Sequence, residues 1–306
     1  MGYVWLGFLF IGLLNFHDPL LSERQMSALA FGLVAALCWG FHDVCARFLS
    51  QRTAISSCMF TVLLIGLIFH SLITLTTSTI EPIPKSAVYL SIGSGIFFVI
   101  ATFGLYYAFQ RGPVRLVSPL IAGYPIISVG WAVFLGDPVS GFQWLAVIII
   151  VAGVSIVAVL SDSSDDDIPP IGLTIVFSII AAIGFAGTFA LGQSASALSD
   201  DMPNTLVTRL TAFLFLATIL ILLKQPIWPN RQSLPWLIAM GLADGIALMC
   251  VLSAGALPDA KYASVASSLF GMLTIILAWI FLRERMTKSQ WAGCAVAFLG
   301  VGYLAV

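Results

Sequence analysis

The sequence predicts an all-α polytopic membrane protein with about ten transmembrane helices, arranged as two inverted five-helix repeats around a central cavity. Three observations lead to this fold class. Apolar residues make up 60% of the chain and charged residues only 9%, whereas about a quarter of a soluble chain is charged. Apolar segments of about 20 residues, long enough to cross a bilayer, alternate with short polar joints. The second half of the chain also repeats features of the first.

The apolar excess requires a lipid environment. A chain of 306 residues with this composition cannot hide its apolar surface in one soluble core, so we expect the lipid bilayer to cover the remainder. The formal net charge of −1 argues against a nucleic-acid partner. The five cysteines lie in apolar segments without the spacing of a metal site, so we expect no metal and no cofactor.

The repeat is clearest at the last joint of each half. An offset of 147 residues places Gln143 on Gln290 without a gap. The same offset aligns Leu135 with Leu282, Asp137 with Glu284, Trp144 with Trp291, and Gly153 with Gly300. The first spans of the two halves share a Gly-Phe pair, at residues 40–41 and 184–185, with an offset of 144. The chain is therefore predicted to be a duplicated unit.

The N-terminal residues 1–26 stand apart from the repeats. Their apolar run, residues 2–16, is shorter than the roughly 20 residues of a membrane span. It also lacks the basic start and the small-residue cleavage site of a signal peptide. We weigh two interpretations: an extra helix, which could lie in the membrane interface, or an extension ahead of a natural start at Met26.

From Met26 onward the apolar segments can be placed one by one. The first repeat, residues 27–160, is predicted to hold spans at 27–49, 55–76, 86–109, 113–135 and 142–160. An acidic linker, residues 161–169, separates the halves. The second repeat, residues 170–306, is predicted to hold spans at 170–192, 204–223, 235–256, 262–282 and 289–305. Each span is expected to be a helix, because a backbone in lipid must satisfy its own hydrogen bonds.

Five spans in each half place the second half upside down relative to the first. An inverted repeat with a site between its halves is the usual build of secondary transporters. Lysine and arginine in the joints indicate the orientation. The side predicted to be cytoplasmic, which leaves the C-terminus outside, carries Arg47, Arg52, Arg111, Arg115, Lys224, Arg231, Arg283, Arg285 and Lys288. The other side carries Arg24, Lys85 and Lys261.

Asp244 is the first candidate functional residue. It lies about nine residues into its predicted span, or about 13 Å deep at 1.5 Å per residue, and its neighbours Gly241, Ala243 and Gly245 are small. An ionisable group at this depth costs several kcal/mol unless it is paired or wetted. We therefore expect Asp244 either to line a substrate cavity or to pair with another helix.

A second candidate group lies on the first span. Trp39, His42, Asp43 and Ala46 are spaced i, i+3, i+4 and i+7, so they share one helix face. Histidine titrates near neutral pH, which makes His42 beside Asp43 a candidate proton-coupling group. The alternative is a structural ion pair between Asp43 and Arg47, one turn apart.

Two further ionisable residues lie within predicted spans. Arg209 lies about one and a half turns into its span. It either extends to the outer interface or faces inward as the partner of an anion or a carboxylate. His70 lies near the end of its span and is interpreted as interfacial.

The fourth span contains two prolines. Pro119 and Pro125 each remove a helical hydrogen bond and free a carbonyl group. An irregular backbone in a membrane is tolerated where it lines a cavity. The candidate wall residues, against simple kinked packing, are Ser118, Tyr124 and Ser128. The candidate aromatic surfaces, which could equally face lipid or the core, are Tyr106, Tyr107 and Trp131.

The spans and joints over residues 27–306 resemble EamA-type members of the drug/metabolite transporter superfamily. Each half in that family typically ends with the pattern Gly-Glu-x-x-x-x-x-Gln-x-x-Gly. The second half has Glu284, Gln290 and Gly293, with Arg283 in place of the first glycine. In the first half, Gly136 and Gln143 match, while Asp137 replaces the glutamate and Ala146 the last glycine.

The resemblance also concerns an arginine that the family tends to carry early in the second helix of each half. Arg209 fills this place in the second half, and no residue fills it in the first. The resemblance implies transport of small metabolites such as amino acids, nucleotide-linked compounds or amphiphilic drugs. We expect a multi-pass protein of the bacterial cytoplasmic membrane.

These features predict a secondary transporter, an exporter or exchanger, that moves a small amino-acid-like or amphiphilic metabolite by alternating access. The expected substrate-binding residues are Asp244, His42, Asp43, Trp39, Tyr124, Ser118, Tyr107, Trp131 and Arg209. Protons are a candidate coupling ion, and we expect a monomer or a homodimer. The alternatives are a membrane structural or assembly subunit and an intramembrane enzyme. The sequence has no His-Glu-x-x-His set and no P-loop, so we expect neither catalysis nor direct use of ATP.

Overall fold

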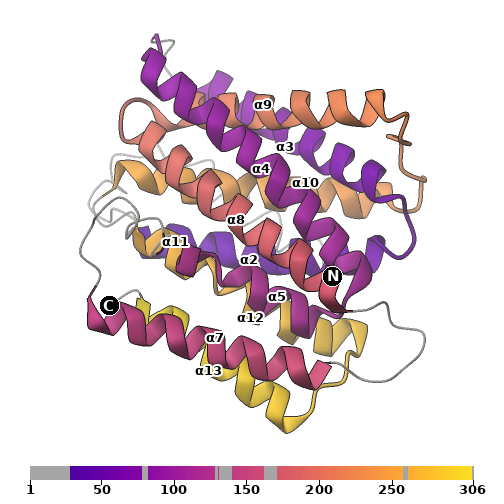
Figure 1. Ribbon diagram of the computed structural model, residues 1–306. Helices are drawn as coiled ribbons and strands as arrows, with labels where there is room; N and C mark the ends of the chain where they lie inside the picture. Colours follow the sequence, from indigo (N-terminus) through magenta and orange to yellow (C-terminus); the bar gives the residue numbers. More distant parts are fainter. Residues whose placement is uncertain are drawn as a thin grey trace, which may run out of the picture.

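The computed structural model describes residues 28–77, 82–127, 130, 140–161, 171–257 and 261–304, and every element in these ranges is helical (Figure 1). The helices of the first half are α2 (Ala28–Leu49), α3 (Ile55–Thr77), α4 (Lys85–Arg111), α5 (Val114–Ala122) and α7 (Gly141–Ser161). Those of the second half are α8 (Ile171–Ser196), α9 (Asp201–Leu222), α10 (Leu234–Ser253), η1 (Ala254–Ala256), α11 (Lys261–Ser267), α12 (Phe270–Leu277), η2 (Ala278–Leu282) and α13 (Lys288–Leu304). The predicted segment 2–16, residues 162–169 of the acidic linker, Ser128 and Trp131 lie outside the described residues.

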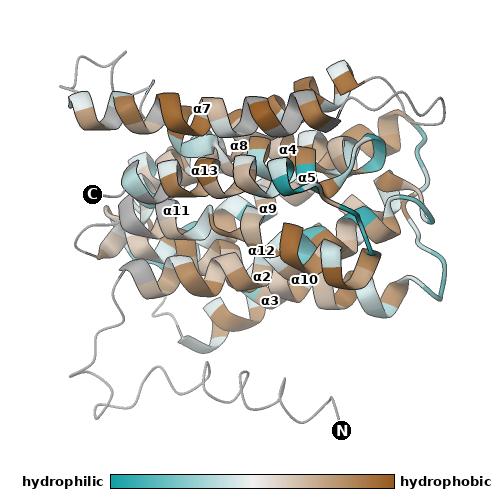
Figure 2. Ribbon diagram, turned by 90° about the horizontal axis from the view of Figure 1, so that it is seen from below, coloured by the Kyte–Doolittle hydropathy of each residue, from teal (hydrophilic) through white to brown (hydrophobic). Residues whose placement is uncertain are grey.

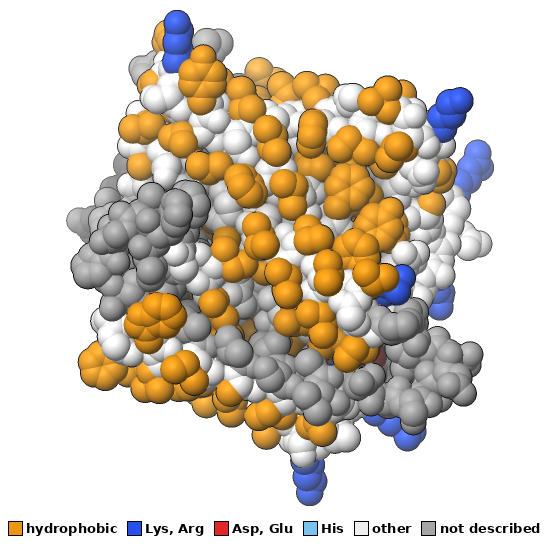
Figure 3. Space-filling model, viewed as in Figure 1, with side chains coloured by type: hydrophobic (Ala, Val, Ile, Leu, Met, Phe, Trp, Pro, Cys, Tyr) orange, Lys and Arg blue, Asp and Glu red, His pale blue; other side chains and the backbone are white. Residues whose placement is uncertain are grey.

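The outward surface of the bundle is apolar. Six of the described helices are long and apolar enough to cross a membrane, namely α2, α3, α4, α8, α9 and α10. Figure 2 shows hydrophobic residues along the helices and hydrophilic ones at the joints, and one broad face is mostly hydrophobic in Figure 3. The chain is therefore a multi-pass membrane protein. The described helices that meet both criteria number six, so the prediction of about ten spans is met only in part.

The predicted ninth span, 262–282, is not one continuous helix. α11 ends at Ser267, α12 begins at Phe270, and the last turn is the π-helix η2. The turn between α11 and α12 contains no proline. In the segment before it, the carbonyl of Ser264 and the hydroxyl of Ser267 both bond to the Tyr124 hydroxyl. Serine groups engaged in this way compete with regular helical hydrogen bonds. Apolar periodicity does not reveal such bonds, so it predicts an unbroken helix here.

Glycines set the distance between α7 and α13. A Cβ atom added to Gly153 would lie 2.6 Å from the carbonyl oxygen of Gly293, and one added to Gly300 would lie 3.1 Å from that of Ala146. The two contacts are equivalent under the offset of 147. They also run in opposite directions along the two helices, so α7 and α13 pack antiparallel.

A second pair of glycines repeats this relation elsewhere in the bundle. A Cβ on Gly95 of α4 would lie 2.5 Å from the carbonyl oxygen of Thr208 on α9, and a Cβ on Gly241 of α10 would lie 2.9 Å from that of Val62 on α3. An offset of 146 relates both members of one contact to both members of the other. Small residues therefore fix equivalent helix contacts in the two halves.

The centre of the bundle is built from both halves. α4 packs along α8, and α2 packs against α10, α11 and α12 (Figure 1). The first helix of each half thus lies beside later helices of the other half. This arrangement brings the polar face of α2 close to Asp244 of α10.

Candidate functional site

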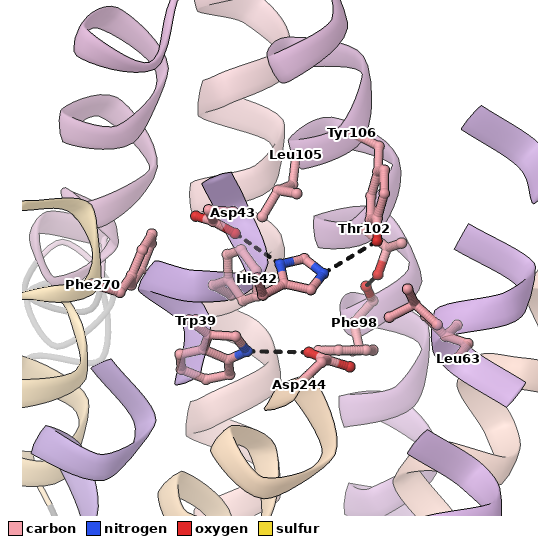
Figure 4. Close-up of a pocket in the computed structure, with 12 residues that line it drawn as sticks. Trp39, His42, Asp43, Leu63, Phe98, Thr102, Leu105, Tyr106, Asp244 and Phe270 are labelled. Atoms are coloured by element: carbon pink, nitrogen blue, oxygen red, sulfur yellow. Dashed lines mark hydrogen bonds and ion pairs between the residues drawn. The ribbon is translucent and has the colours of Figure 1, made fainter. Parts of the chain in front are cut away.

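A small cavity lies among α2, α3, α4, α8, α10 and α12 (Figure 4). Its volume is about 20 Å³, which is room for one water molecule. The lining residues are Trp39, His42, Asp43, Val62, Leu63, Phe98, Thr102, Leu105, Tyr106, Phe185, Asp244 and Phe270. Both halves contribute side chains, and four of the expected site residues are among them.

Asp244 is fully paired at the edge of this cavity. Its side chain accepts a hydrogen bond from Trp39 Nε1 at 3.1 Å through Oδ1 and from Arg209 Nη1 at 2.7 Å through Oδ2. Asp244 is only 4% exposed, so the contact with Arg209 is a buried ion pair. Both interpretations of Asp244 therefore apply, because it lines the cavity and also pairs with residues of two other helices.

Arg209 faces the interior of the bundle and pairs with Asp244 without lining the cavity. Its side chain is fully buried, which excludes the interpretation that it extends to the outer interface. Gly66 of α3 leaves the necessary space, since a Cβ there would lie 3.0 Å from Arg209 Cζ. The ring of Phe98 packs on the guanidinium with 4.7 Å between Cζ and the ring centre. Such a cation–π contact helps to stabilise a desolvated arginine.

The interfacial interpretation of His70 is wrong, because the side chain is buried. It is 2% exposed, and its Nε2 lies 2.8 Å from the carbonyl oxygen of Gly245. Position near the end of a span did not indicate burial, because α10 covers that end of α3. His70 thus belongs to the contact between α3 and α10, one residue from Asp244.

His42 connects two other polar groups of the cavity. Its Nδ1 lies 2.9 Å from Asp43 Oδ1, and its Nε2 lies 3.1 Å from the Tyr106 hydroxyl. Figure 4 shows the imidazole between these two partners. An ionised carboxylate only accepts hydrogen bonds, so a neutral His42 donates from Nδ1 to Asp43 and accepts at Nε2 from Tyr106. The three residues form a buried hydrogen-bonded chain.

The alternative ion pair between Asp43 and Arg47 is not formed. Arg47 Nε lies 3.4 Å from Glu284 Oε1, and Arg47 Nη1 donates to the carbonyl oxygen of Phe109 at 2.7 Å. Arg47 therefore joins the ends of α2 and α4 to the joint that contains Glu284, and it does not pair with Asp43. Among the described residues, Asp43 Oδ2 has no hydrogen-bond partner.

Aromatic rings form the wall beside Asp244. Trp39 lies 5.4 Å from Phe189, 5.9 Å from Phe185 and 6.2 Å from Phe270, measured between ring centroids. The indole therefore has its N–H on Asp244 and its rings against three phenylalanines. Such packing fixes the orientation of the donor.

Tyr124 and Ser118 lie near the cavity without lining it. The Tyr124 hydroxyl is 2.6 Å from Ser267 Oγ and also contacts the carbonyl of Ser264, so it holds the segment that follows α5 against the break between α11 and α12. Ser118 is fully buried, and its Oγ has no partner among the described residues. Tyr124 therefore supports the broken helices beside the cavity.

Tyr107 points away from the cavity, and its neighbour Tyr106 lines it instead. Tyr107 is 36% exposed and stacks on Phe103 and Phe177 with centroid distances of 6.3 and 5.5 Å. The sequence holds a signal for Tyr106, because Phe98, Thr102 and Tyr106 are spaced by four residues and so share one helix face. This spacing indicates that Tyr106, and not Tyr107, lies on the face of α4 that lines the cavity.

The acid of the last joint, Glu284, lies outside the cavity and connects the two halves. Glu284 Oε2 accepts a hydrogen bond from the backbone N–H of Val114 at 3.0 Å. Val114 is the first residue of α5, where helical N–H groups have no partner within the helix. Glu284 of the second half therefore caps a helix of the first half while it pairs with Arg47.

Gln290 also connects the two halves. Its Oε1 accepts from the backbone N–H of Thr287 at 2.9 Å, and its own backbone N–H donates to Thr287 Oγ1 at 3.2 Å. This reciprocal pair is a capping box for α13. Gln290 Nε2 additionally donates to the carbonyl oxygen of Leu160, near the end of α7, at 3.0 Å. The turn motif thus has a mechanical role that spacing alone did not indicate.

Comparisons with known proteins agree with this architecture. The EamA-like transporter family matches the chain twice, at residues 26–159 and 172–306. A protein of Archaeoglobus fulgidus, named only as an uncharacterized transporter, is 33% identical over 134 residues, which are 43% of this chain and 44% of that protein. A protein of Lactobacillus helveticus, named as a sugar uptake protein, is 23% identical over 84% of this chain and 91% of its own length.

A solved crystal structure shares the fold. It superposes with a TM-score of 0.64 at 17% identity and covers 90% of this chain and 95% of its own chain. Identity at this level supports the fold alone. Since the family match covers both repeats and nearly the whole chain, the chain belongs to the EamA-like transporter family.

Proposed function

We propose that the protein is a secondary transporter, an exporter or exchanger, of a small amino-acid-like or amphiphilic metabolite. The observation that carries the proposal is the buried polar cluster of Asp43, His42, Tyr106 and Asp244 around one cavity between the two halves. Ionisable groups within a membrane span are costly. Their arrangement around a shared cavity supports a role in binding rather than in packing alone.

Alternating access follows from the proposed antiparallel relation of the halves. The site would open to one side when one half rotates against the other, and to the opposite side after the reverse motion. Contacts at one end of the bundle, such as Arg47 with Glu284, would then have to break and reform. Protons are the proposed coupling ion, because the chain of Asp43, His42 and Tyr106 can hold and pass a proton.

Uptake into proteoliposomes tests the proposal. The panel should contain labelled amino acids, amines and sugars, the last because of the name of the Lactobacillus relative. We expect the wild type to carry at least one solute class. Absence of flux for the entire panel in sealed vesicles with intact protein would contradict a transport function.

Two neighbouring tyrosines provide a matched pair of variants. Tyr106→Phe removes the hydroxyl on His42, whereas Tyr107→Phe removes a hydroxyl from a residue that packs on Phe103 and Phe177 outside the cavity. We expect Tyr106→Phe to lower the transport rate about tenfold, the loss expected for about 1.4 kcal/mol, and Tyr107→Phe to leave it unchanged. Equal effects of the two variants would place the site elsewhere.

A further inference from the structure

The two carboxylates at the cavity differ in how many of their oxygens have a hydrogen-bond donor. Both oxygens of Asp244 have a donor, from Trp39 and Arg209. Asp43 has only His42 on Oδ1, and its Oδ2 has no partner among the described residues. With a neutral His42, the pair of Asp244 and Arg209 cancels, and one negative charge, that of Asp43, remains unmatched.

His42, at 2.9 Å from Asp43, supplies a positive charge only when it takes up a proton itself, and no other described group around Asp43 supplies one. α2 itself contributes His42 and Cys45, α4 contributes Tyr106, α3 contributes Cys58 near Tyr106, and α10 contributes Asp244. The cavity residues from α8 and α12 are Phe185 and Phe270. Arg209 of α9 lies behind Asp244 and is already paired with it.

An unmatched carboxylate is unfavourable at this place. Asp43 is 1% exposed and lies six residues before the end of α2, which is about 9 Å along the helix. A buried charge must be neutralised or paired. The occupant that the site requires therefore carries one positive charge.

The surrounding rings indicate what kind of cation fits. Trp39, Tyr106, Phe185 and Phe270 all line the cavity, and aromatic faces attract organic ammonium groups. A bare metal ion would require several oxygen ligands, and the described residues contain no cluster of three or more metal-ligating side chains. Aromatic walls with a single free carboxylate oxygen favour an organic cation.

Building on the proposed transport function, we propose that Asp43 is the cation-accepting group of the cavity and that it holds either one proton or the positive charge of an organic cation. Binding of the cation displaces the proton from the Asp43 carboxyl, and the proton leaves to the water on the side to which the cavity is open. Both loaded states are neutral. A cavity with neither occupant carries a buried negative charge, which disfavours its closure.

This charge balance selects among the solutes of the proposed function. An anion would add to the unmatched negative charge. A zwitterion would place a second carboxylate beside Asp244, and Arg209, which pairs with Asp244 through Nη1 and has no hydrogen-bond partner on Nε and Nη2 among the described residues, does not line the cavity. The favoured substrate is therefore an amine or a quaternary ammonium compound with one net positive charge, exchanged one for one with a proton. The cavity of about 20 Å³ must widen by separation of the aromatic side chains to admit it.

Proton release on binding tests this inference directly. Benzyltrimethylammonium has a permanent charge and an aromatic ring, and it cannot cross a bilayer as a neutral base. Added to the full-length protein in nanodiscs at low buffer capacity near pH 7, it should release about one proton for each cation bound. Its affinity should fall by up to tenfold per pH unit on acidification, and phenylacetate should release none.

Variants at Asp43 supply the controls. Asp43→Asn should weaken binding of benzyltrimethylammonium at least tenfold and abolish proton release, whereas Asp43→Glu should retain release. Unchanged binding in Asp43→Asn would overturn the inference. Equal proton release by Na⁺ would also overturn it, because the site would then be one for an inorganic cation. If Asp43→Asn does not fold, the wild type and Asp43→Glu test the inference. Binding of benzyltrimethylammonium to both proteins without proton release would then contradict it.

Flux measurements separate this inference from the proposed function. If the wild type carries phenylalanine or a sugar in proteoliposomes but binds benzyltrimethylammonium without proton release, the cation exchange is wrong and the transport function stands. If the wild type moves no solute, the transport function fails, while the nanodisc measurement still decides whether Asp43 holds a cation.

Discussion

The two halves of the chain pack their helices in the same way but place different side chains at the cavity. The offset of 146 that relates their close helix contacts also places Phe98 on Asp244 and Leu63 on Arg209. The first half therefore presents two apolar residues where the second half presents a buried ion pair. Moreover, Phe98 packs on the Arg209 guanidinium, so one copy supports the polar group of the other.

This difference shows which positions of a duplicated protein can diverge. A helix contact that admits no Cβ atom must keep a small residue in both copies. A cavity needs only one set of polar groups, and a second ion pair in the same low-dielectric space would add a further desolvation cost. The close helix contacts are therefore repeated, and the polar residues of the cavity are not.

The largest expected effect comes from breaking the ion pair of the second half. Arg209→Leu leaves Asp244 as a buried charge with only Trp39 as a partner, and such a loss typically costs about 3–5 kcal/mol. Reversible unfolding in mixed micelles measures the change in the free energy of unfolding. A cost below about 1 kcal/mol would mean that the pair is not buried as described.

A double variant sharpens the same comparison. Arg209→Leu combined with Asp244→Leu removes both charges, and we expect it to be more stable than Arg209→Leu alone, since hydrophobic replacement of a whole buried pair is often nearly neutral. Transport should nevertheless be lost in both variants. A stable double variant with wild-type flux would show that the pair of Arg209 and Asp244 takes no part in transport.

The next effect concerns the contacts that the two halves share. Gly95→Ala and Gly241→Ala each place a Cβ within 3 Å of neighbouring atoms, and overpacking of this kind costs about 1–3 kcal/mol. We expect similar losses from both variants, because the contacts are equivalent. Thermal unfolding in detergent gives the comparison.

A glycine in open space is the matched control. Gly172 of α8 has no heavy atom within 4 Å of an added Cβ. Gly172→Ala should therefore stabilise the helix slightly, by up to about 1 kcal/mol. If all three substitutions shifted the unfolding temperature in the same direction, close packing would not explain the repeated glycines.

Some features of the two halves can be predicted from the sequence, and others depend on how the helices are rotated against each other. Patterns along the chain indicate the duplication and the membrane spans, and they mark Asp244 and His42 as candidate site residues. The bond between Trp39 and Asp244 joins residues 205 positions apart, and it depends on how α2 is rotated against α10. The choice of Tyr106 over Tyr107 depends on the same kind of rotation, which apolar periodicity defines poorly in a helix that is hydrophobic on all sides.

Breaks in helices were predictable only where proline marks them. Pro119 and Pro125 indicated an irregular fourth span, and helix α5 ends at Ala122. The break between α11 and α12 depends instead on the partners of Ser264 and Ser267. Their partner is Tyr124, which follows α5 and cannot be identified from the local sequence.

A smaller effect is expected at the joint that links the halves. Glu284→Ala removes the acceptor for the Val114 N–H and the partner of Arg47. Loss of a helix cap costs about 0.5–2 kcal/mol, and the ion pair, which is partly exposed, adds little. Glu284→Gln should retain much of the cap and lose less. Equal losses in the two variants, measured by unfolding in mixed micelles, would assign the effect to charge rather than to capping.

The smallest expected effect lies one residue earlier, where the halves differ in sequence. The first half has Gly136, and the second half has Arg283 at the position related by 147. Arg283 has a φ of 56° and a ψ of 29°, a left-handed conformation that costs a residue with a Cβ about 1–2 kcal/mol. Arg283→Gly should relieve this cost, while the greater freedom of glycine in the unfolded chain offsets part of the gain. We expect a net stabilisation of about 0.5–1 kcal/mol.

Charge and backbone effects at Arg283 can be separated by a second substitution. Arg283→Ala removes the same charge but keeps the Cβ, so Arg283→Gly should be more stable than Arg283→Ala by about 1 kcal/mol. Lys224, with a φ of 52°, should show the same order for its glycine and alanine variants. Arg285, which does not share the positive φ, should show the reverse order, because glycine there only adds disorder to the unfolded chain. Equal stabilities of Arg283→Gly and Arg283→Ala would mean that the turn carries no strain, and the glycine of the first half would then need another explanation.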